Sequence, residues 1–196
     1  MLAAQFMEDP LYTFMLPDPS TRQEVLRIFF RHYLEMLSPY SDIYASSAQW
    51  EAVALVFRSE QFGSSILSQL NYRRRIATAI IKSLPACRYI GFKGFIRGVS
   101  ILHSMSSAWL HMLGDRPYAH LDMLVVQQAY RGSGQVSKMM EPLLAECDAK
   151  DWACTLETQN PNNVPLYGRY GFTLVETIRL PDSDLEQYCM VYNRNN

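Results

Sequence analysis

A short glycine-bearing turn lies between an apolar segment and a helix-forming segment at residues 121–137, LDMLVVQQAYRGSGQVS. Gly132 and Gly134 allow the positive φ angles that a tight turn of this kind needs. A helix that begins directly after such a turn presents unpaired N–H groups and the positive end of its dipole. This arrangement suits an anion, and we expect a phosphate-bearing group to bind here.

Two other interpretations of this turn stay open on the residues alone. Gly132 and Gly134 also occur together in turns that bind nothing. A dinucleotide-binding turn is the second alternative, because Glu157 lies at a suitable distance downstream to bind a ribose. Against it, Ser137 stands where a third glycine would be, the loop after Val126 is long for that turn, and little chain follows to complete a doubly wound sheet.

The composition describes a folded chain with nearly balanced charge. Its 196 residues are 48% hydrophobic and 19% charged, and the formal net charge is −1. This length accommodates one domain or at most two small ones, and the apolar content is sufficient for a core. We do not expect nucleic acid as a partner, because binding along a phosphate backbone requires an excess of basic residues.

The cysteines predict free thiols and no metal site. Cys87, Cys147, Cys154 and Cys189 form no CxxC pair and have no histidine at ligand spacing. Residues 1–12 lack the basic region of a signal peptide, and no apolar run approaches the roughly 20 residues of a membrane helix. We therefore expect a cytoplasmic protein with reduced thiols and no membrane contact.

The first half of the chain predicts helices and one pair of strands. Residues 9–20, DPLYTFMLPDPS, predict a loop, after which Ser20 or Thr21 caps a helix that runs to about Leu37. The elements expected next are strands at Ile43–Ser47 and Trp50–Phe57, a helix over 63–83 and a helix over Phe92–Met112. The basic run Tyr72-Arg73-Arg74-Arg75 predicts a solvated helix face, with a phosphate or substrate contact as the alternative.

The second half alternates between strand and helix patterns. We expect strands at Tyr118–Val126 and Trp152–Thr158, helices at Gln135–Lys150 and Val164–Tyr170, and final strands near Gly171–Leu180 and Leu185–Tyr192. A strand–helix–strand unit implies a parallel pair, and the last two strands can pair antiparallel. The predicted fold class is therefore α/β, with a central mixed β-sheet and helices on both faces.

The glycine turn resembles motif A of the GNAT N-acetyltransferase superfamily, Q/R-x-x-G-x-G/A. Arg131 takes the first position and Gly134 the central glycine, whereas Val136 stands where Gly or Ala is usual. The Val136 side chain would narrow the approach to the loop. The resemblance implies that this loop binds the pyrophosphate of coenzyme A through residues Arg131, Gly132, Ser133, Gly134, Gln135, Val136 and Ser137.

Residues 156–172, LETQNPNNVPLYGRYGF, resemble motif B of the same family, N-x(6)-LY-x(3)-GF. The specific resemblance covers about Tyr118–Tyr192. The DPLY…PD opening and the N-P-x-N-V-P pattern are similar to a branch that includes puromycin N-acetyltransferases. The resemblance implies a GNAT-like acyl-CoA N-acyltransferase fold in one domain over 1–196, with a substrate-side half at 1–117 and an acetyl-CoA-binding half at 118–196.

The same resemblance implies direct transfer of an acetyl group from acetyl-CoA to a primary amine of a small molecule, within a ternary complex. The strand Met123–Val126 would separate from Leu156–Thr158 and leave a cleft for pantetheine. Leu124, Val125 and Val126 would form its wall, with one N–H group acting as the oxyanion donor. Because the thioester is already activated, positioning would do much of the work.

Tyr167 would be the general acid that protonates the leaving thiolate, since a phenol is protonated at neutral pH and close to a thiol in basicity. Asn160 would bond the pantetheine arm, and Asn163 would cap the helix that carries Tyr167. All three belong to the expected coenzyme A-binding set.

The general base stays open among several groups. His120 and Asp122 lie on the strand beside the expected cleft, where alternation places them on one face and Leu121 on the other. Glu157 lies on the adjoining strand. His120 has a suitable pKa, and a chain of water molecules is an equally open alternative.

Two further functions remain open. The chain could instead acetylate a protein or peptide, or it could be a non-catalytic acyl-CoA sensor. Val136 and the unassigned base favour the sensor, and so would burial of the Tyr167 hydroxyl, whereas an intact Tyr167 favours the enzyme. Acceptor specificity would come from residues near Tyr12, Phe14 and Asp18 and from the helix Arg22–Leu37. The expected partner is a small-molecule amine, and a homodimer is compatible with the sequence.

Overall fold

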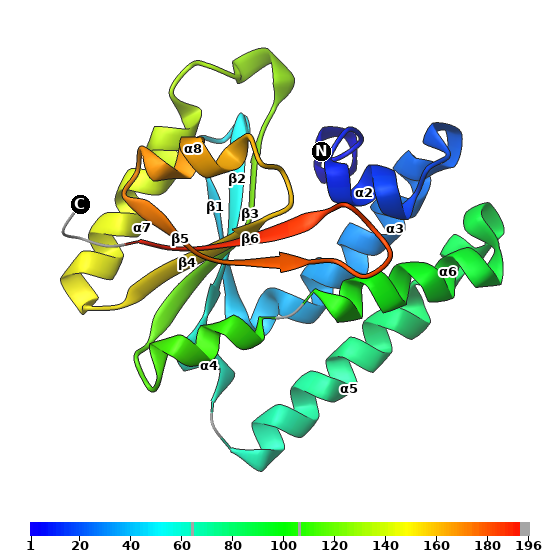
Figure 1. The fold of residues 1–196 in the computed structure, drawn as a ribbon, viewed down its shortest axis with the longest axis horizontal. Coiled ribbons are helices and arrows are strands. Elements are labelled where there is room, and N and C mark those ends of the chain that lie inside the picture. Colours follow the sequence, from blue (N-terminus) through cyan, green and yellow to red (C-terminus); the bar gives the residue numbers. More distant parts are fainter. Residues whose placement is uncertain (64, 106, 193–196) are drawn as a thin grey trace. The chain divides into compact units, whose positions relative to one another are not determined.

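The computed structural model describes residues 1–63, 65–105 and 107–192, and it divides into two compact units. One unit comprises residues 1–40 and 61–105, and the other comprises residues 41–60 and 106–196. The first, here called the helical unit, contains helices, and the second, here called the sheet unit, holds the β-sheet (Figure 1). The sheet unit takes two strands from the predicted half 1–117, and the division of one domain at residue 117 stays a prediction.

Six strands of the sheet unit form one mixed sheet with the order β1-β2-β3-β4-β6-β5. Their bounds are Ser41–Ala45 (β1), Ala52–Arg58 (β2), Tyr118–Val126 (β3), Ala153–Thr158 (β4), Phe172–Arg179 (β5) and Glu186–Tyr192 (β6). β3 and β4 are parallel, and the other neighbouring pairs of these described strands are antiparallel. The predicted mixed sheet, its parallel pair and its final antiparallel pair are therefore confirmed.

Helix α7 (Gln135–Lys150) joins the parallel strands and covers one face of the sheet. Its apolar residues recur at helical spacing, with Met139, Leu143 and Cys147 on one row and Met140 and Leu144 beside them. These side chains are buried against strands β2, β3, β4 and β6 in the main core cluster. The sequence predicted the bounds of α7 and of β3 correctly because both have strong periodic patterns.

A short 3-10 helix, η3 (Ala108–Leu113), packs on the opposite face of the sheet. Trp109 is 2% exposed and contacts Cys189 and Val191 of β6. Helices therefore lie on both faces, as predicted. The short helix α8 (Asn163–Gly168) follows β4 and packs against β5.

The helical unit begins with two short helices, α1 and α2, that the sequence did not predict. Its elements are α1 (Leu2–Gln5), α2 (Pro10–Met15), α3 (Pro19–Leu37), η1 (Ser38–Tyr40), α5 (Ile66–Lys82), η2 (Leu84–Ala86) and α6 (Cys87–Ser104), with α4 (Ser59–Phe62) at its junction with the sheet unit. The prediction of a loop over 9–20 was wrong. Asp9 caps α2 and Asp18 caps α3, each followed by a proline at the first helical position, where a missing N–H costs nothing.

Two further predictions required correction. Phe92–Met112 is not one helix, because α6 begins at Cys87, ends at Ser104 and is interrupted at Gly91, whose φ of 65° and ψ of 169° are not helical. The strand predicted from Trp50 begins at Ala52, since Trp50 has a φ of 61° and belongs to the turn.

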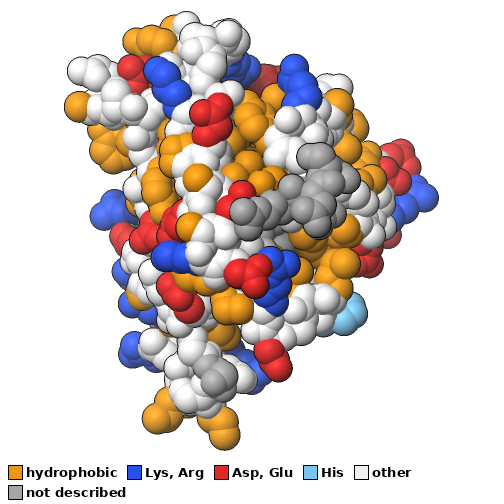
Figure 2. Space-filling model, turned by 90° about the vertical axis from the view of Figure 1, so that its left-hand side faces the viewer, with side chains coloured by type: hydrophobic (Ala, Val, Ile, Leu, Met, Phe, Trp, Pro, Cys, Tyr) orange, Lys and Arg blue, Asp and Glu red, His pale blue; other side chains and the backbone are white. Residues whose placement is uncertain are grey.

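Among the described residues, no group of three His, Cys, Asp or Glu side chains is arranged to hold a metal ion. Within those same residues, every helix is too short or too polar to cross a membrane. The four cysteines are free, and Cys147, Cys154 and Cys189 are buried. On the face drawn in Figure 2, acidic and basic side chains are interspersed, in keeping with the balanced charge.

Candidate functional site

The parallel strands β3 and β4 pair along only part of their length. Their backbone pairing ends at Leu121 opposite Leu156. Beyond this point β3 stays paired with β2 and β4 stays paired with β6. Residues 122–126 of β3 and 157–158 of β4 therefore face each other without backbone pairing. We call this separation within the sheet the strand opening.

A β-bulge at Asp122 marks the start of the strand opening. The pairing of β3 with β2 passes from Leu121 to Met123, so Asp122 is an extra residue. A bulge interrupts the ladder and the alternation of side chains. Accordingly Leu121 belongs to the main core cluster, and Leu124 and Val126 pack against the same cluster. The expectation that His120 and Asp122 share one face, with Leu121 on the other, stays a prediction.

The backbone of β3 directs alternate N–H groups at the strand opening. The N–H of Gln127 donates to the carbonyl oxygen of Glu51 at 2.8 Å, on the β2 side. Successive N–H groups of a strand point to opposite edges. The N–H groups of Val126 and Leu124 consequently point to the opening, and that of Val125 points to β2. Of the three predicted wall residues, Leu124 and Val126 thus have N–H groups that point toward the opening, as an oxyanion donor requires.

The glycine loop leads from β3 to α7. Gly132 and Gly134 both have a φ of 78°, and Gly134 occupies the N-cap position of α7. A Cβ atom added at either glycine would have nothing within 4 Å, so the space beside the backbone is open. Arg131, Gly132, Ser133 and Gly134 are exposed. The loop and the first helical N–H groups therefore fit a phosphate-bearing ligand.

The first residues of α7 are partly anchored in the protein. Val136 is partly buried and packs against the main core cluster, and its effect on the approach to the loop stays a prediction. Gln135 is 7% exposed, and its amide Nε2 lies 3.4 Å from the Ser133 hydroxyl. The Ser137 hydroxyl lies 2.8 Å from the Tyr170 hydroxyl.

The end of β4 positions both predicted asparagines. The hydroxyl oxygen of Thr158 accepts hydrogen bonds from the Asn160 N–H at 3.2 Å and from the Asn163 side-chain amide at 3.0 Å. Because the carboxyl ends of parallel strands meet at one edge of a sheet, these groups lie at the same edge as the glycine loop. Asn163 does not cap α8, because its side-chain amide donates to Thr158. The N-cap residue is Asn162, whose side chain makes no cap hydrogen bond.

Tyr167 lies on α8 and is 8% exposed. Its ring belongs to the same core cluster as Leu121 and Leu156 and lies 6.0 Å from that of Phe172. Burial raises the pKa of Tyr167 to about 12. Among the described residues its hydroxyl makes no hydrogen bond, yet it is not one of the fully enclosed polar atoms that lack a partner. The hydroxyl is therefore protonated at neutral pH and available to a ligand.

Polar groups gather on the face of the sheet opposite α7. The Nδ1 atom of His120 lies 2.9 Å from the hydroxyl of Thr155, which shares a strand face with Glu157. Burial lowers the pKa of His120, and the charge of Asp122 opposes this shift. Burial raises the pKa of Glu157, and a hydrogen bond from Trp109 opposes it. His120 is thus neutral at pH 7, as a base must be.

Sequence reasoning missed Trp109, Thr155 and Thr158. Trp109 fell within the long helix predicted over Phe92–Met112, and no local pattern connects it with Glu157, which lies 48 positions later. Thr155 and Thr158 could have been noted as polar residues in an apolar strand. Their partners depend on strand register and on the return of the chain after β4.

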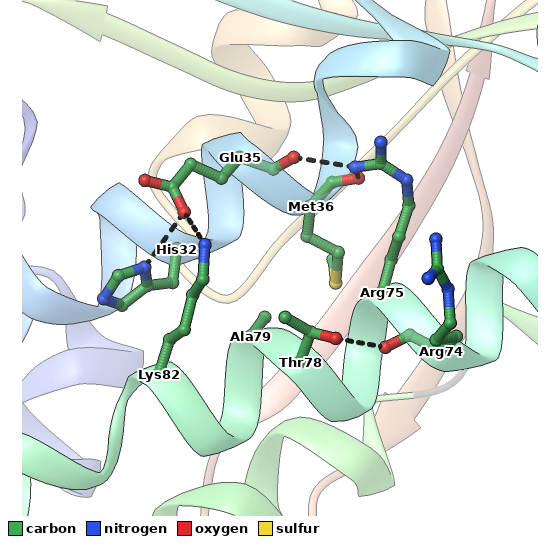
Figure 3. Close-up of a pocket in the computed structure, with 8 residues that line it drawn as sticks. All are labelled: His32, Glu35, Met36, Arg74, Arg75, Thr78, Ala79 and Lys82. Atoms are coloured by element: carbon green, nitrogen blue, oxygen red, sulfur yellow. Dashed lines mark hydrogen bonds and ion pairs between the residues drawn. The ribbon is translucent and has the colours of Figure 1, made fainter.

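A pocket in the helical unit is a second candidate site (Figure 3). His32 and Lys82 converge on the Glu35 carboxylate, at 3.2 and 2.9 Å, and Arg75 donates to backbone oxygens at the end of α3. Arg74 donates to Asn71. These bonds join α3 to α5 and occupy most of the charged groups. The interpretation of the basic run as a phosphate contact stays a prediction.

Comparisons with known proteins agree with this architecture. Residues 103–181 match the family model for an acetyltransferase (GNAT) domain. A structure described as histone acetyltransferase HPA2 and related acetyltransferase from Corynebacterium glutamicum is 20% identical, with coverage of 97% of this chain and 85% of that one and a TM-score of 0.61. Arylalkylamine N-acetyltransferase 2 from Aedes aegypti is 14% identical, with coverage of 95% and 87% and a TM-score of 0.51. No curated protein sequence matches the chain significantly.

Proposed function

We propose that this chain, which carries a GNAT acetyltransferase domain over residues 103–181, transfers an acetyl group from acetyl-CoA to a primary amine of a small molecule. The observation that carries the proposal is the strand opening, which begins at the Asp122 bulge. It ends at the sheet edge where the glycine loop begins. An extended ligand with a phosphate-bearing end fits both features at once.

Acetyl-CoA supplies an activated thioester, so the protein must bind and orient it. The loop from Arg131 to Gly134 and the first N–H groups of α7 would hold the pyrophosphate. The N–H groups of Leu124 and Val126 point into the opening and would bind the pantetheine arm and the thioester oxygen. Asn160, fixed by Thr158, would bond the same arm from β4.

Tyr167 would protonate the departing thiolate. Its pKa of about 12 keeps the hydroxyl protonated throughout the neutral range, so the acid form is always present. Since its oxygen has no competing partner among the described residues, the proton can be directed at a ligand. Its ring is held in place by the surrounding core cluster.

The proposal also specifies the class of acceptor, a small amine. The Aedes protein is named for arylalkylamines and the Corynebacterium structure for histone acetylation, so relatives of this fold include both classes by name. We favour a small amine because the N-P-x-N-V-P pattern at Asn160–Pro165 and the DPLY…PD opening resemble the puromycin N-acetyltransferase branch. Acetylation of a peptide is the alternative outcome.

Isothermal titration with acetyl-CoA tests the binding part of the proposal. We expect the wild type to bind and Gly134→Glu to bind at least about tenfold more weakly, a difference of about 1.4 kcal/mol. Gly134→Asn is the matched control, because Asn tolerates a positive φ and adds no charge. A wild type that does not bind acetyl-CoA would overturn the transferase assignment.

An acceptor screen by thiol release then separates the substrate classes. Tryptamine, phenethylamine and puromycin represent small amines, and a lysine-containing peptide and a peptide with a free N-terminus represent proteins. We expect turnover with at least one small amine and none with the peptides. The reverse result would assign peptide acetylation.

A non-catalytic acyl-CoA sensor is the second candidate, because Tyr167 is only 8% exposed. A sensor would bind acetyl-CoA in the titration and release no thiol with any acceptor. The two experiments together therefore distinguish the enzyme from the sensor.

A further inference from the structure

Helix α5 of the helical unit has apolar side chains on two opposite faces. On its inner face, Tyr72 and Ile76 are partly buried, and the helix packs on α3. On its outer face, Ile66, Leu70 and Ile81 are 84%, 61% and 63% exposed. A surface helix that packs on one side normally keeps its other side polar. The outer face of α5 is instead apolar and largely open to solvent.

The exposed apolar residues of the outer face form a continuous stripe. Ile66, Leu70, Ala77 and Ile81 follow one another at helical spacing, so they lie on one side of α5. They run from its first turn to its last turn, and all four are exposed. Leu67, which is 78% exposed, widens the stripe at the first turn. We call this set, Ile66, Leu67, Leu70, Ala77 and Ile81, the α5 stripe.

The chain segment that contains α5 is strongly basic. Residues 61–105 include seven Lys and Arg residues and no Asp or Glu. Arg73 and Arg74 lie on either side of the α5 stripe, because neighbouring positions of a helix are rotated by about 100° about its axis. Both are exposed, and among the described residues neither forms an ion pair. An apolar stripe between two uncompensated cations suits a partner that is anionic at its surface and apolar beneath it.

The charge and shape of this face favour a lipid surface over a protein partner. A symmetric dimer through the α5 stripe would bring Arg73 and Arg74 close to the same residues of the second copy, where like charges repel. An acidic protein would need a groove that fits the projecting Ile66, Leu67 and Leu70 side chains. A bilayer needs no such groove, because its acyl chains accept apolar side chains and its anionic headgroups attract arginine.

We propose that the outer face of α5 binds the surface of an anionic lipid bilayer. The α5 stripe enters the boundary between the headgroups and the acyl chains, and Arg73 and Arg74 pair with lipid phosphates. The helix lies in the plane of this boundary, as amphipathic helices with cationic flanks do. The inference is independent of the proposed acetyl transfer, and it differs from the sequence-based expectation of no membrane contact.

Vesicle flotation with the full chain tests this proposal. One vesicle preparation consists of phosphatidylcholine, and the other contains equal amounts of phosphatidylcholine and anionic phosphatidylglycerol. We expect the affinity for the anionic vesicles to exceed that for the neutral ones by at least about tenfold, and high salt to reduce the difference. No binding to either preparation, or equal binding to both, would overturn the proposal.

Paired substitutions separate the α5 stripe from other exposed apolar residues. Leu70→Gln combined with Ile81→Gln should weaken binding to the anionic vesicles by at least about tenfold, because two aliphatic side chains no longer enter the bilayer. Gln is a good helix former, so α5 should be kept. Ile43→Gln combined with Leu174→Gln is the matched control, since these residues of β1 and β5 are 53% and 42% exposed. The control should bind the vesicles like the wild type.

Arg73→Gln combined with Arg74→Gln supplies a second readout. Each lost cation should weaken binding to the anionic vesicles by about fivefold, and the effect of salt should decrease. Wild-type affinity in this variant would overturn the proposal, even if the Leu70 and Ile81 variant did not fold. Wild-type affinity in a folded Leu70 and Ile81 variant would do the same.

Two further outcomes would assign the α5 stripe to a protein and also overturn the proposal. The first is a wild-type dimer, seen without lipid by sedimentation, that dissociates when Leu70 and Ile81 are replaced. The second is binding to poly-glutamate that is as tight as binding to the anionic vesicles and depends on the same two residues. Acetyl-CoA titration of each variant is read separately: its result bears on the proposed function and leaves the lipid proposal unchanged.

Discussion

The two ends of the β3–β4 pair use charge in opposite ways. At the paired end, the Arg58 side chain is 2% exposed, donates to Asp42 at 3.0 Å and Glu146 at 2.7 Å, and stacks on the Trp152 ring. At the separated end, Glu157 has hydrogen-bond donors but no cationic partner among the described residues. The paired end therefore uses its charges for stability, and the separated end leaves one available to a ligand.

The two ends of the β3–β4 pair also differ in backbone hydrogen bonding. At the paired end, all the N–H and C=O groups between β3 and β4 can bond within the sheet. At the separated end, the Asp122 bulge stops this pairing and turns the N–H groups of Leu124 and Val126 into the opening. The difference teaches that one extra residue in β3 coincides with the point where its pairing with β4 ends.

Tyr167→Phe should have the largest effect, at the separated end. Removing a general acid typically costs about 10²–10⁴-fold in rate, so kcat should fall by that order while acetyl-CoA affinity stays unchanged. Rapid thiol-release kinetics and titration measure the two quantities. Tyr192→Phe is the matched control, since its hydroxyl donates to Asp148 of α7 and lies outside the proposed chemistry.

The pH dependence of the same variant sharpens this prediction. The Tyr167 proton is lost only as pH rises through about 12, so Tyr167 should produce no fall in kcat below about pH 11. A wild-type kcat that decreased between about pH 8 and 9, and no longer did so in Tyr167→Phe, would contradict the assigned pKa shift.

Arg58→Met should have the next largest effect, at the paired end. It leaves Asp42 and Glu146 without their shared cation. Because these carboxylates are 48% and 29% exposed, the loss of unfolding free energy should exceed the roughly 1 kcal/mol of a surface pair but stay below the roughly 3–5 kcal/mol of a fully buried one. Urea unfolding followed by circular dichroism measures this loss. Arg116→Met, which removes an exposed ion pair with Asp151, should cost no more than about 1 kcal/mol. A loss of acetyl-CoA affinity without a loss of stability in Arg58→Met would contradict the contrast between the two ends.

Glu35→Gln should have the smallest effect, because Glu35 belongs to an exposed network of the helical unit. Hydrogen bonds from Lys82 and His32 lower the pKa of Glu35 to about 2. A carboxylate with a lowered pKa stabilises the fold above its unfolded pKa of about 4.5 and loses this contribution as pH falls toward 2. The variant should therefore show a shallower decrease of stability between about pH 4.5 and 2, measured by thermal unfolding at several pH values. An identical acid dependence in variant and wild type would show that this network adds no stability.

The sequence predicted well the strands and helices that have a regular apolar pattern. It predicted poorly the short helix that begins at an Asp-Pro pair and the point where α6 ends. The bounds of β3 followed from the alternation of apolar residues and those of α7 from their helical spacing, and both are local properties. The loop predicted over 9–20 failed because Asp and Pro were read as loop formers, although each Asp-Pro pair begins a helix. The long helix predicted over Phe92–Met112 failed because α6 ends at Ser104 and a separate 3-10 helix, η3, forms over Ala108–Leu113.

For the candidate site, the sequence located the segments but not their relations. The expected separation of the strands agrees with the pairing that ends at Leu121 and Leu156. The bulge, the bond of Asn163 to Thr158 and the bond of Trp109 to Glu157 were not predictable. Each depends on register or on contacts between residues far apart in sequence, for which a local pattern carries no signal.

By itself the sequence determined which groups are available: two glycines at a turn, a tyrosine in a short helix and several acids near a strand end. It determined these because turn chemistry and apolar periodicity act over a few residues. Only the tertiary structure decided that the N–H groups of Leu124 and Val126 face the strand opening and that Asn163 bonds Thr158 and does not cap α8. It also decided that Glu157 has no cationic partner among the described residues. Those outcomes follow from strand pairing and packing, which join residues that the chain order keeps apart.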